Sequence, residues 1–315
     1  MEYGERLALF PQLAAAVERI ASDKESGAAE ILRSSAEAFS LLEAEEISTA
    51  EEGQRLVMEF GIALVRAQPL MAPLINLANE AISAATANPD RATISAAGAA
   101  RDFIRKAERA TIDAAARAAD LIKGGTAVLT HSRSSTVLDA FTLAHSTGAH
   151  FDVVATESRP LLEGRTLASE LARAGIKVSL IADAAAVLMI DRIDMVLLGA
   201  DKIAPEYLIN KIGTRMIALA ARARGCAVYA VADTSKFINA TETFSFADRQ
   251  RSAGEIWPDA PPTVTVLNPH FEPVPLDHFT AIIAEDCLLS SEEAARRAKE
   301  MDLHPALISI MKFGR

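Results

Sequence analysis

Hydrophobic positions in the first 120 or so residues recur every three to four residues, which is the spacing of one buried face of an α-helix. No strand-like alternation interrupts this pattern. The segments that carry it are 3–21, 26–46, 51–69, 73–87 and 92–122. The sequence therefore predicts an all-helical N-terminal domain.

The pattern changes at Gly124 and Gly125, after which short apolar runs alternate with helical stretches. The runs that predict strands are 127–132, 151–160, 177–183, 195–201, 227–233 and 263–269. The stretches that predict helices are 135–148, 164–175, 184–192 and 210–225. This alternation is typical of right-handed βαβ units around a parallel sheet. We expect a helical domain over residues 1–123 and an α/β domain over residues 124–315, with the boundary within the long helix or at the Gly pair.

Composition narrows the possible functions. The formal net charge of −10 argues against a general nucleic-acid binder, although it permits a local basic pocket. The two cysteines, Cys226 and Cys287, form no Cys/His cluster, so we expect no metal site. No apolar run approaches the roughly 18 residues of a membrane span, and no secretory leader is evident. We expect a soluble cytoplasmic protein.

Polar residues follow nearly every predicted strand, where open parallel sheets bind their ligands. They are Ser132, Arg133, Ser134, Ser135, Glu157, Ser158, Arg159, Asp183, Asp201, Lys202, Asp233, Ser235, Lys236 and Asn268. Loops after strands are commonly polar, so any one of these residues is equally well explained as a solvated loop residue. Taken together, their cations, hydroxyls, amides and carboxylates are suited to a phosphorylated polyol.

Two predicted helix starts add to this interpretation. Ser134 or Ser135 can be an N-cap, and the free N–H groups of that helix end suit an anion. In "NKIGT", Asn210 can cap the next helix and Lys211 can direct its charge at a phosphate. The chain has no GxGxxG and no GxxxxGK[ST] motif, so we expect no nucleotide cofactor.

Six motifs, in order, resemble one protein family. They are "LTHSRSSTVL", "TESRPLLEGRTLASELARAGIKVSLIADAA", "VLLGADKI", "NKIGTRMIALAA", "VYAVADTSKF" and "LNPHFEPVP". The family contains the α, β and δ regulatory subunits of eukaryotic translation initiation factor 2B and their archaeal relatives. It also contains isomerases of methylthioribose-1-phosphate and ribose-1,5-bisphosphate.

The resemblance implies an N-terminal helical domain, a Rossmann-like C-terminal domain and homodimers formed through the C-terminal domains. In the isomerases of this family, a cysteine and an aspartate pass the protons. Asp201 corresponds to the aspartate, whereas Ser132 stands where those enzymes have the cysteine. An unassisted serine hydroxyl does not readily pass a proton near neutral pH, so this difference argues against the known isomerase chemistry.

The resemblance also assigns binding residues. Asn210, Lys211 and Lys236 would contact phosphate and sugar, and Asp201 would bind hydroxyl groups. The remaining residues would line the anion loop or close the site from the helical domain. They are Ser132, Arg133, Ser134, Ser135, Ser26, Gly27 and Ala28. Gln68 lies near the position of a phosphate-binding arginine of the family, for which Arg66 is a possible substitute.

Three functions remain open. The sequence favours a regulatory or sensing protein that binds a phosphorylated sugar or a nucleoside monophosphate, without a cofactor and with a possible translation-factor partner. The alternative is an aldose–ketose isomerase of a ribose-1-phosphate-type substrate, with Asp201 as proton donor and acceptor and His131 or a water in place of the thiol. The third is an interaction module with an empty pocket.

Overall fold

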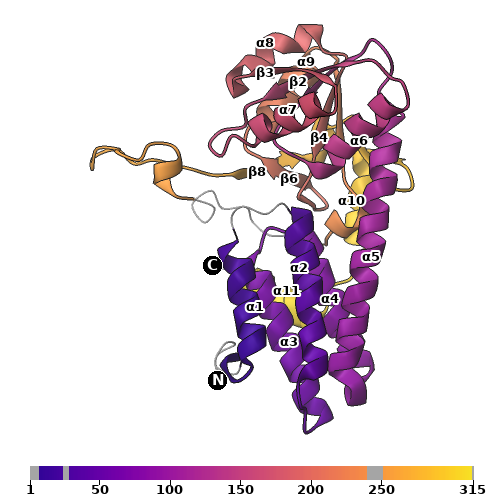
Figure 1. Ribbon diagram of the computed structural model, residues 1–315, viewed down its shortest axis with the longest axis vertical. Coiled ribbons are helices and arrows are strands. Elements are labelled where there is room, and N and C mark those ends of the chain that lie inside the picture. Colours follow the sequence, from indigo (N-terminus) through magenta and orange to yellow (C-terminus); the bar gives the residue numbers. More distant parts are fainter. Residues whose placement is uncertain (1–6, 24–27, 240–250, 314–315) are drawn as a thin grey trace. The chain divides into compact units, whose positions relative to one another are not determined.

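The computed structural model describes residues 7–23, 28–239 and 251–313, and its contacts divide the chain into two units (Figure 1). The first unit comprises Met1–Arg109, Ser235–Glu242 and Lys299–Arg315. The second comprises Ala110–Thr234 and Thr243–Ala298. The contacts thus change units within a long helix, which is one of the two places where the sequence allows a domain boundary. The division into domains after residue 123 stays a prediction.

The first unit is helical, as predicted. Its helices are α1 (Pro11–Ser22), α2 (Ala28–Ser40), α3 (Ala50–Ala67), α4 (Ala72–Ala87), the first part of α5 (Ala92–Ala119) and α11 (Pro305–Phe313), with the short η1 (Leu7–Leu9), η2 (Leu41–Ala44) and η3 (Pro89–Arg91). Helix α3 begins after Thr49, whose side chain accepts a hydrogen bond from the Glu52 N–H group and so caps the helix. The apolar faces meet around Phe39 and Phe60, whose rings pack edge to face at 5.2 Å.

The second unit is built on a seven-stranded sheet in the order β10-β9-β7-β4-β1-β2-β3. The strands are β1 (Ala127–Thr130), β2 (Asp152–Thr156), β3 (Lys177–Ile181), β4 (Met195–Gly199), β7 (Ala227–Val231), β9 (Ala281–Ile283) and β10 (Leu288–Leu289). All neighbours pair in parallel except β9 and β10. The predicted parallel sheet is confirmed.

One predicted strand is wrong. Residues 263–269 are irregular, and the sixth parallel strand is β9 instead. The apolar alternation of this segment favours a strand only where a neighbour covers one face. Val264 and Leu267 are instead exposed at 43% and 57%.

A second, antiparallel sheet was not anticipated. It contains β5 (Lys202–Ile203), β6 (Tyr207–Lys211) and β8 (Phe271–Pro275), with β6 in the middle. Asn210 and Lys211 therefore lie at the end of a strand, where Asn210 pairs with Glu272, and not at the start of a helix as the sequence suggested. The helix begins three residues later, at Thr214.

Helices pack on the seven-stranded sheet and bury its apolar side chains. They are the second part of α5, α6 (Ser135–Ser146), α7 (Glu163–Arg173) and α9 (Thr214–Ala223). The unit also contains α8 (Ala186–Met189) and α10 (Ser291–Lys299). The short elements η4 (Asp183–Ala185), η5 (Ile190–Arg192), η6 (Thr234–Lys236), η8 (Ala253–Glu255) and η9 (Leu276–His278) connect them. Phe141 of α6 and Leu167 of α7 are fully buried in one cluster with Val128 and Leu197 of the sheet. This core fixes the strand ends and helix starts that carry the polar residues.

Candidate functional site

The chain reverses direction across the sheet between β1 and β4. From β1 the chain continues to β2 and β3 on one side, and β4 lies on the other side of β1. At such a reversal, the loops after two neighbouring strands diverge and leave a crevice outside their carboxyl ends. Residues after Thr130 and Gly199 therefore lie where an open α/β sheet binds its ligand.

The start of α6 packs directly against the end of β4. Ser134 is the N-cap of α6, and its Oγ accepts a hydrogen bond from the Val137 N–H group at 3.4 Å. A Cβ atom added to Gly199 would come within 2.7 Å of the Ser134 side chain, so only glycine allows this close approach. Ser135, the first helical residue, is exposed. The predicted N-cap is thus Ser134.

A chain of hydrogen bonds joins the ends of β1 and β2 to the loop after β6. His131 Nε2 donates to the Ile212 carbonyl at 2.8 Å, which leaves Nδ1 to accept from the Thr156 hydroxyl at 2.6 Å in the neutral ring. The Ser158 hydroxyl lies 3.1 Å from Thr156 Oγ1 and accepts from the Ser132 N–H group at 2.8 Å. Both ring nitrogens of the buried His131 are therefore engaged within the protein.

Burial also keeps His131 neutral. Desolvation lowers the pKa of His131, and the nearby positive charge of Lys211 acts in the same direction. The hydrogen bond to the Ile212 carbonyl and the charges of Asp183 and Glu163 oppose this shift without cancelling it. The buried, neutral His131 therefore links the end of β1 to the loop after β6.

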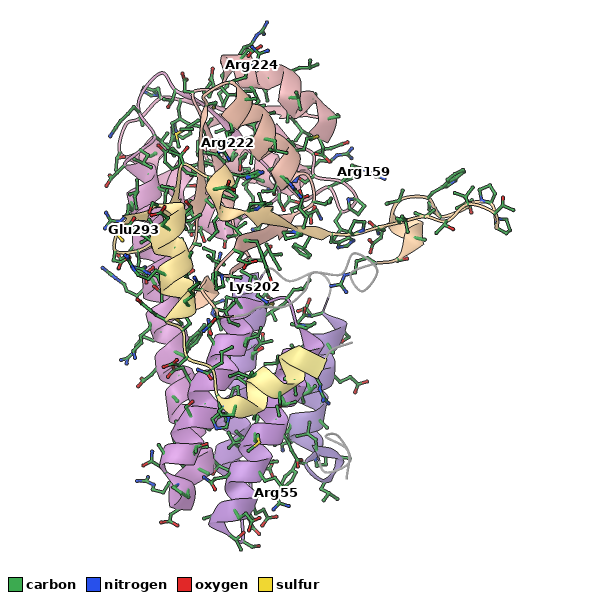
Figure 2. All side chains as sticks on the ribbon, turned by 180° about the vertical axis from the view of Figure 1, so that it is seen from behind. Arg55, Arg159, Lys202, Arg222, Arg224 and Glu293 are labelled. Atoms are coloured by element: carbon green, nitrogen blue, oxygen red, sulfur yellow. The ribbon has the colours of Figure 1, made fainter. Side chains whose placement is uncertain are left out.

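Ser132 has an unusual backbone conformation. Its φ is 67°, and that of Ser158 is 62°, which places both residues in the left-handed region that non-glycine residues rarely adopt. The Asp183 carboxylate holds the second loop by accepting the N–H groups of Ser158 and Arg159, each at 2.7 Å. Arg159 itself lies on the exposed loop between β2 and α7, where Figure 2 labels it. The hydrogen bonds of these loops fix the position of Ser132.

Lys211 is almost fully buried at the end of β6. Its Nζ lies 2.6 Å from Oε1 of Glu163, which is the first residue of α7. Its side chain is 2% exposed, compared with 28% for Glu163. Lys211 is therefore not a solvated loop residue, and its charge is balanced by a glutamate that sequence reasoning did not single out.

An acidic side chain accepts hydrogen bonds from the backbone N–H groups at the start of α9. Glu272 Oε1 accepts the N–H groups of Gly213 at 2.7 Å and Arg215 at 2.9 Å. Gly213 is the N-cap, with φ 105°, whereas the Asn210 amide donates to the Thr214 hydroxyl at 2.9 Å. The expectation that Asn210 caps this helix is wrong, because Asn210 lies on β6 and a carboxylate from β8 fills the helix end.

A second cation at the site also has an acidic partner. Arg133 forms a two-point ion pair with Glu170 of α7, with Nε–Oε2 at 2.9 Å and Nη2–Oε1 at 2.7 Å. These hydrogen bonds raise the pKa of Arg133. The side chains are 32% and 25% exposed, so this pair is more open to solvent than the Lys211 pair.

Asp201 follows β4, the strand beside β1. Its N–H group donates to the Ile209 carbonyl at 2.9 Å, which ties it to β6, and the residue is half-buried. Lys202, labelled in Figure 2, is the next residue and is fully buried in β5. The second unit thus brings Asp201 to the same edge of the sheet as the residues after β1.

The remaining predicted residues belong to the first unit or lie outside the described ranges. Ala28 is the exposed first residue of α2, and Gln68 ends α3 with its amide donating to the Ile20 carbonyl at 3.0 Å. Lys236 is half-buried at the end of η6. Ser26 and Gly27 lie outside the described residues. Contact of these residues with the sheet edge stays a prediction.

Sequence reasoning missed Glu163, Thr156, Glu272 and the pair of His270 and Glu255. His270 Nε2 lies 2.5 Å from Glu255 Oε2, and burial lowers the pKa of His270 despite that carboxylate. Glu163 offered a signal, since it follows a predicted strand and opens the motif "EGRTLASEL". Glu272 offered none, because its role depends on the unpredicted pairing of β6 and β8.

A hollow of about 280 Å³ lies at the opposite, amino edge of the sheet. It is lined by Gly125, Thr126, His145, His150, Phe151, Asp152, Gly175, Ile176 and Lys177. None of the predicted site residues borders it. Within the described ranges, no group of three or more acidic, histidine or cysteine side chains is arranged to hold a metal ion. No helix of those ranges is long and apolar enough to cross a bilayer.

Comparison with known proteins gives the family. Residues 24–290 match the Initiation factor 2 subunit family. A ribose 1,5-bisphosphate isomerase of Archaeoglobus fulgidus is 34% identical over 274 residues, which cover 86% of this chain and 87% of that protein. A putative translation initiation factor eIF-2B subunit 2-like protein of Pyrococcus furiosus is 34% identical over 223 residues, or 70% of this chain and 78% of that protein.

A solved structure agrees with this family assignment. The translation initiation factor eIF-2B of Pyrococcus horikoshii superposes with a TM-score of 0.76 at 29% identity, covering 89% of this chain and 97% of that one. The match spans both the helical segments and the α/β segments that the sequence distinguishes. The chain belongs to the Initiation factor 2 subunit family.

Proposed function

We propose that this protein is an aldose–ketose isomerase acting on a ribose-1-phosphate-type substrate, with ribose 1,5-bisphosphate as the first candidate. The observation that carries the proposal is Lys211, a lysine held almost fully buried next to Ile212, whose carbonyl accepts a hydrogen bond from His131 after β1. A buried cation at the carboxyl edge of a parallel sheet suits the phosphate of a small ester. The relative that covers 86% of the chain is named for an isomerase of such an ester.

The reaction needs one proton donor and one proton acceptor. Opening the sugar ring requires a proton on the ring oxygen, and forming the C2 carbonyl requires the C2 hydroxyl to lose one while a hydrogen moves from C2 to C1. Substrate and product are isomers, so no other reactant is consumed. Asp201, after β4, is the group proposed to pass a proton. A carboxylate in this role typically contributes a factor of about 10²–10⁴ in rate.

We propose a group other than His131 as the second proton carrier, because both of its ring nitrogens are engaged within the protein. The resemblance to the family puts Ser132 at the position of the isomerase cysteine, with a hydroxyl in place of a thiol. A hydroxyl is a much weaker proton donor and acceptor near neutral pH than a thiol, so we expect slow turnover.

Turnover of ribose 1,5-bisphosphate, followed by NMR with purified protein, tests the proposal. We expect the aldose signals to be replaced by those of a 2-ketose that carries both phosphates. Asp201→Asn is expected to lower the rate by about 10²–10⁴-fold while leaving the unfolding midpoint near that of the wild type. Equal rates for the two proteins, or no ketose with wild-type protein, would reject this function.

A regulatory or sensing protein without catalysis is the second candidate. The serine at position 132 is the observation that favours it. Its support from the sequence comparison is weaker, because the initiation-factor-like relative found there covers 70% of the chain, compared with 86% for the isomerase. In that case the ligand would be a sugar phosphate or a nucleoside monophosphate, and a translation factor would be the partner. Stable binding without turnover would favour this candidate.

We also propose a cytoplasmic homodimer formed through the α/β unit. Exposed apolar side chains on the adjoining helices α8 and α9 support this part of the proposal, because contiguous exposed apolar side chains mark interaction surfaces. They are Val187, Leu188, Met216 and Leu219. Leu188 is 80% exposed.

A further inference from the structure

Helix α7 carries two glutamates that pair with two different cations of the candidate site. Glu163 and Glu170 are seven residues apart, which is close to two helical turns, so they lie along one face of the helix. Glu163 holds Lys211 from β6, and Glu170 holds Arg133 from the loop after β1. Two of the three cations that the sequence assigned to ligand binding, Lys211 and Arg133, therefore have carboxylate partners on the same helix.

The pair at Lys211 is strongly shielded from water. Its Nζ–Oε1 distance is 2.6 Å, and the lysine side chain is 2% exposed. The other oxygen, Oε2 of Glu163, is buried and accepts no hydrogen bond from the described residues. A negative charge in such a place is weakly screened, so it acts strongly on any anion brought near Lys211.

We propose that α7 determines how much negative charge a ligand of this site must carry, because Glu163 competes with the ligand for Lys211. This inference rests on the proposed function, since it assumes that Lys211 binds a phosphate. A phosphate that reaches Lys211 must either share it with the Glu163 carboxylate or displace that carboxylate. Both routes oppose binding, so only a strongly anionic ester binds well, and Glu163 determines specificity. Glu170 acts in the same way, less strongly, on the more exposed Arg133.

The test measures the affinity for ribose 1,5-bisphosphate by calorimetry. Glu163→Gln keeps the size of the side chain and removes its charge, and it is expected to lower the dissociation constant at least about tenfold. Asp152→Asn is the matched control. It breaks a Lys177–Asp152 pair at 3.0 Å on the opposite sheet edge, where the side chains are 77% and 55% exposed. The control should bind as the wild type does.

Two outcomes would overturn the inference. Weaker binding by Glu163→Gln would mean that the carboxylate accepts a ligand hydroxyl group or orients Lys211 for the ligand. Unchanged affinity would mean that Glu163 does not compete at all. If Glu163→Gln fails to fold because Lys211 is left buried without its partner, Glu170→Gln replaces it. That variant is expected to bind a few-fold more tightly than the wild type, and unchanged or weaker binding would again reject the inference.

Failure of the inference can be told apart from failure of the proposed function. Lys211→Ala should weaken binding of the same ligand by about 10- to 100-fold, the effect of losing a charge-assisted hydrogen bond. If Lys211→Ala weakens binding and Glu163→Gln does not tighten it, the phosphate site stands and the competition is rejected. If neither the wild type nor Glu163→Gln binds the ester, both are rejected.

Discussion

At the scale of single residues, the candidate site is held by pairs whose members lie far apart in the chain. The Ser132 N–H group donates to the Ser158 hydroxyl at 2.8 Å, and Lys211 pairs with Glu163 of α7. His131 likewise bonds to Thr156 and to the Ile212 carbonyl. The environments of these residues therefore exist only in the folded protein.

The buried, neutral His131 predicts a pH dependence of stability. Burial lowers its pKa in the folded protein below the value of about 6.5 in the unfolded chain. As pH falls below about 6.5, the unfolded chain takes up a proton that the folded protein resists, so the stability present at higher pH is lost. We expect the free energy of unfolding, measured with urea, to decrease from pH 7 to pH 5.

His131→Asn should make that decrease smaller, because the residue no longer titrates. Part of the slope should remain, since burial also lowers the pKa of His270 and His304. Carboxylates contribute at lower pH, as for Asp286, whose pKa the Arg297 hydrogen bond lowers to about 2. A slope identical to that of the wild type would show that His131 is not a buried neutral group.

At the scale of elements, helix α7 is positioned by its close approach to β2. A Cβ atom added to Gly164 would lie 1.7 Å from the Thr156 carbonyl oxygen, so the backbone of the helix start touches the end of the strand. This contact brings Glu163 to Lys211 and places Thr156 beside His131. The start of α7 and the end of β2 thus form one structural element of the site.

Gly164→Ala is therefore expected to destabilise the protein by at least about 1–3 kcal/mol, since the rigid strand backbone must move. Gly98→Ala in α5 is the control, because an added Cβ there meets nothing within 4 Å. That change should stabilise the protein by up to about 1 kcal/mol, the usual preference for alanine in a helix. Urea unfolding measures both. Similar stability of Gly164→Ala and the wild type would contradict the close approach.

The elements themselves were only partly predictable. Long amphipathic helices such as α3 and buried strands such as β4 follow from periodicity, because their patterns repeat over whole elements. The short β5 and the edge strand β8 do not, since β5 has only two residues and β8, "FEPVP", contains two prolines, which are rare in strands. The Asn210–Lys211 pair was assigned to a helix start, although it ends β6.

At the scale of the whole molecule, the sequence predicted the class of the fold and the order of its parts. A change from helical to alternating patterning is visible near Gly124 without any structure. The sequence does not show that the chain returns to the helical unit. Two later segments join that unit, Ser235–Glu242 and Lys299–Arg315. Those segments have ordinary local patterns, and only their long-range contacts assign them to that unit. The fold alone does not give a substrate class, so the proposed substrate is taken from the name of a relative, a ribose 1,5-bisphosphate isomerase.

The most direct test of the account is a crystal structure of the protein with ribose 1,5-bisphosphate bound. The account predicts a phosphate oxygen about 2.7–2.9 Å from Lys211 Nζ, the distance of a charge-assisted hydrogen bond, with the sugar next to Asp201 and the loop after β1. A ligand seated elsewhere, with the Lys211–Glu163 pair intact and its surroundings empty of ligand, would contradict the central claim that this edge of the sheet binds a sugar phosphate.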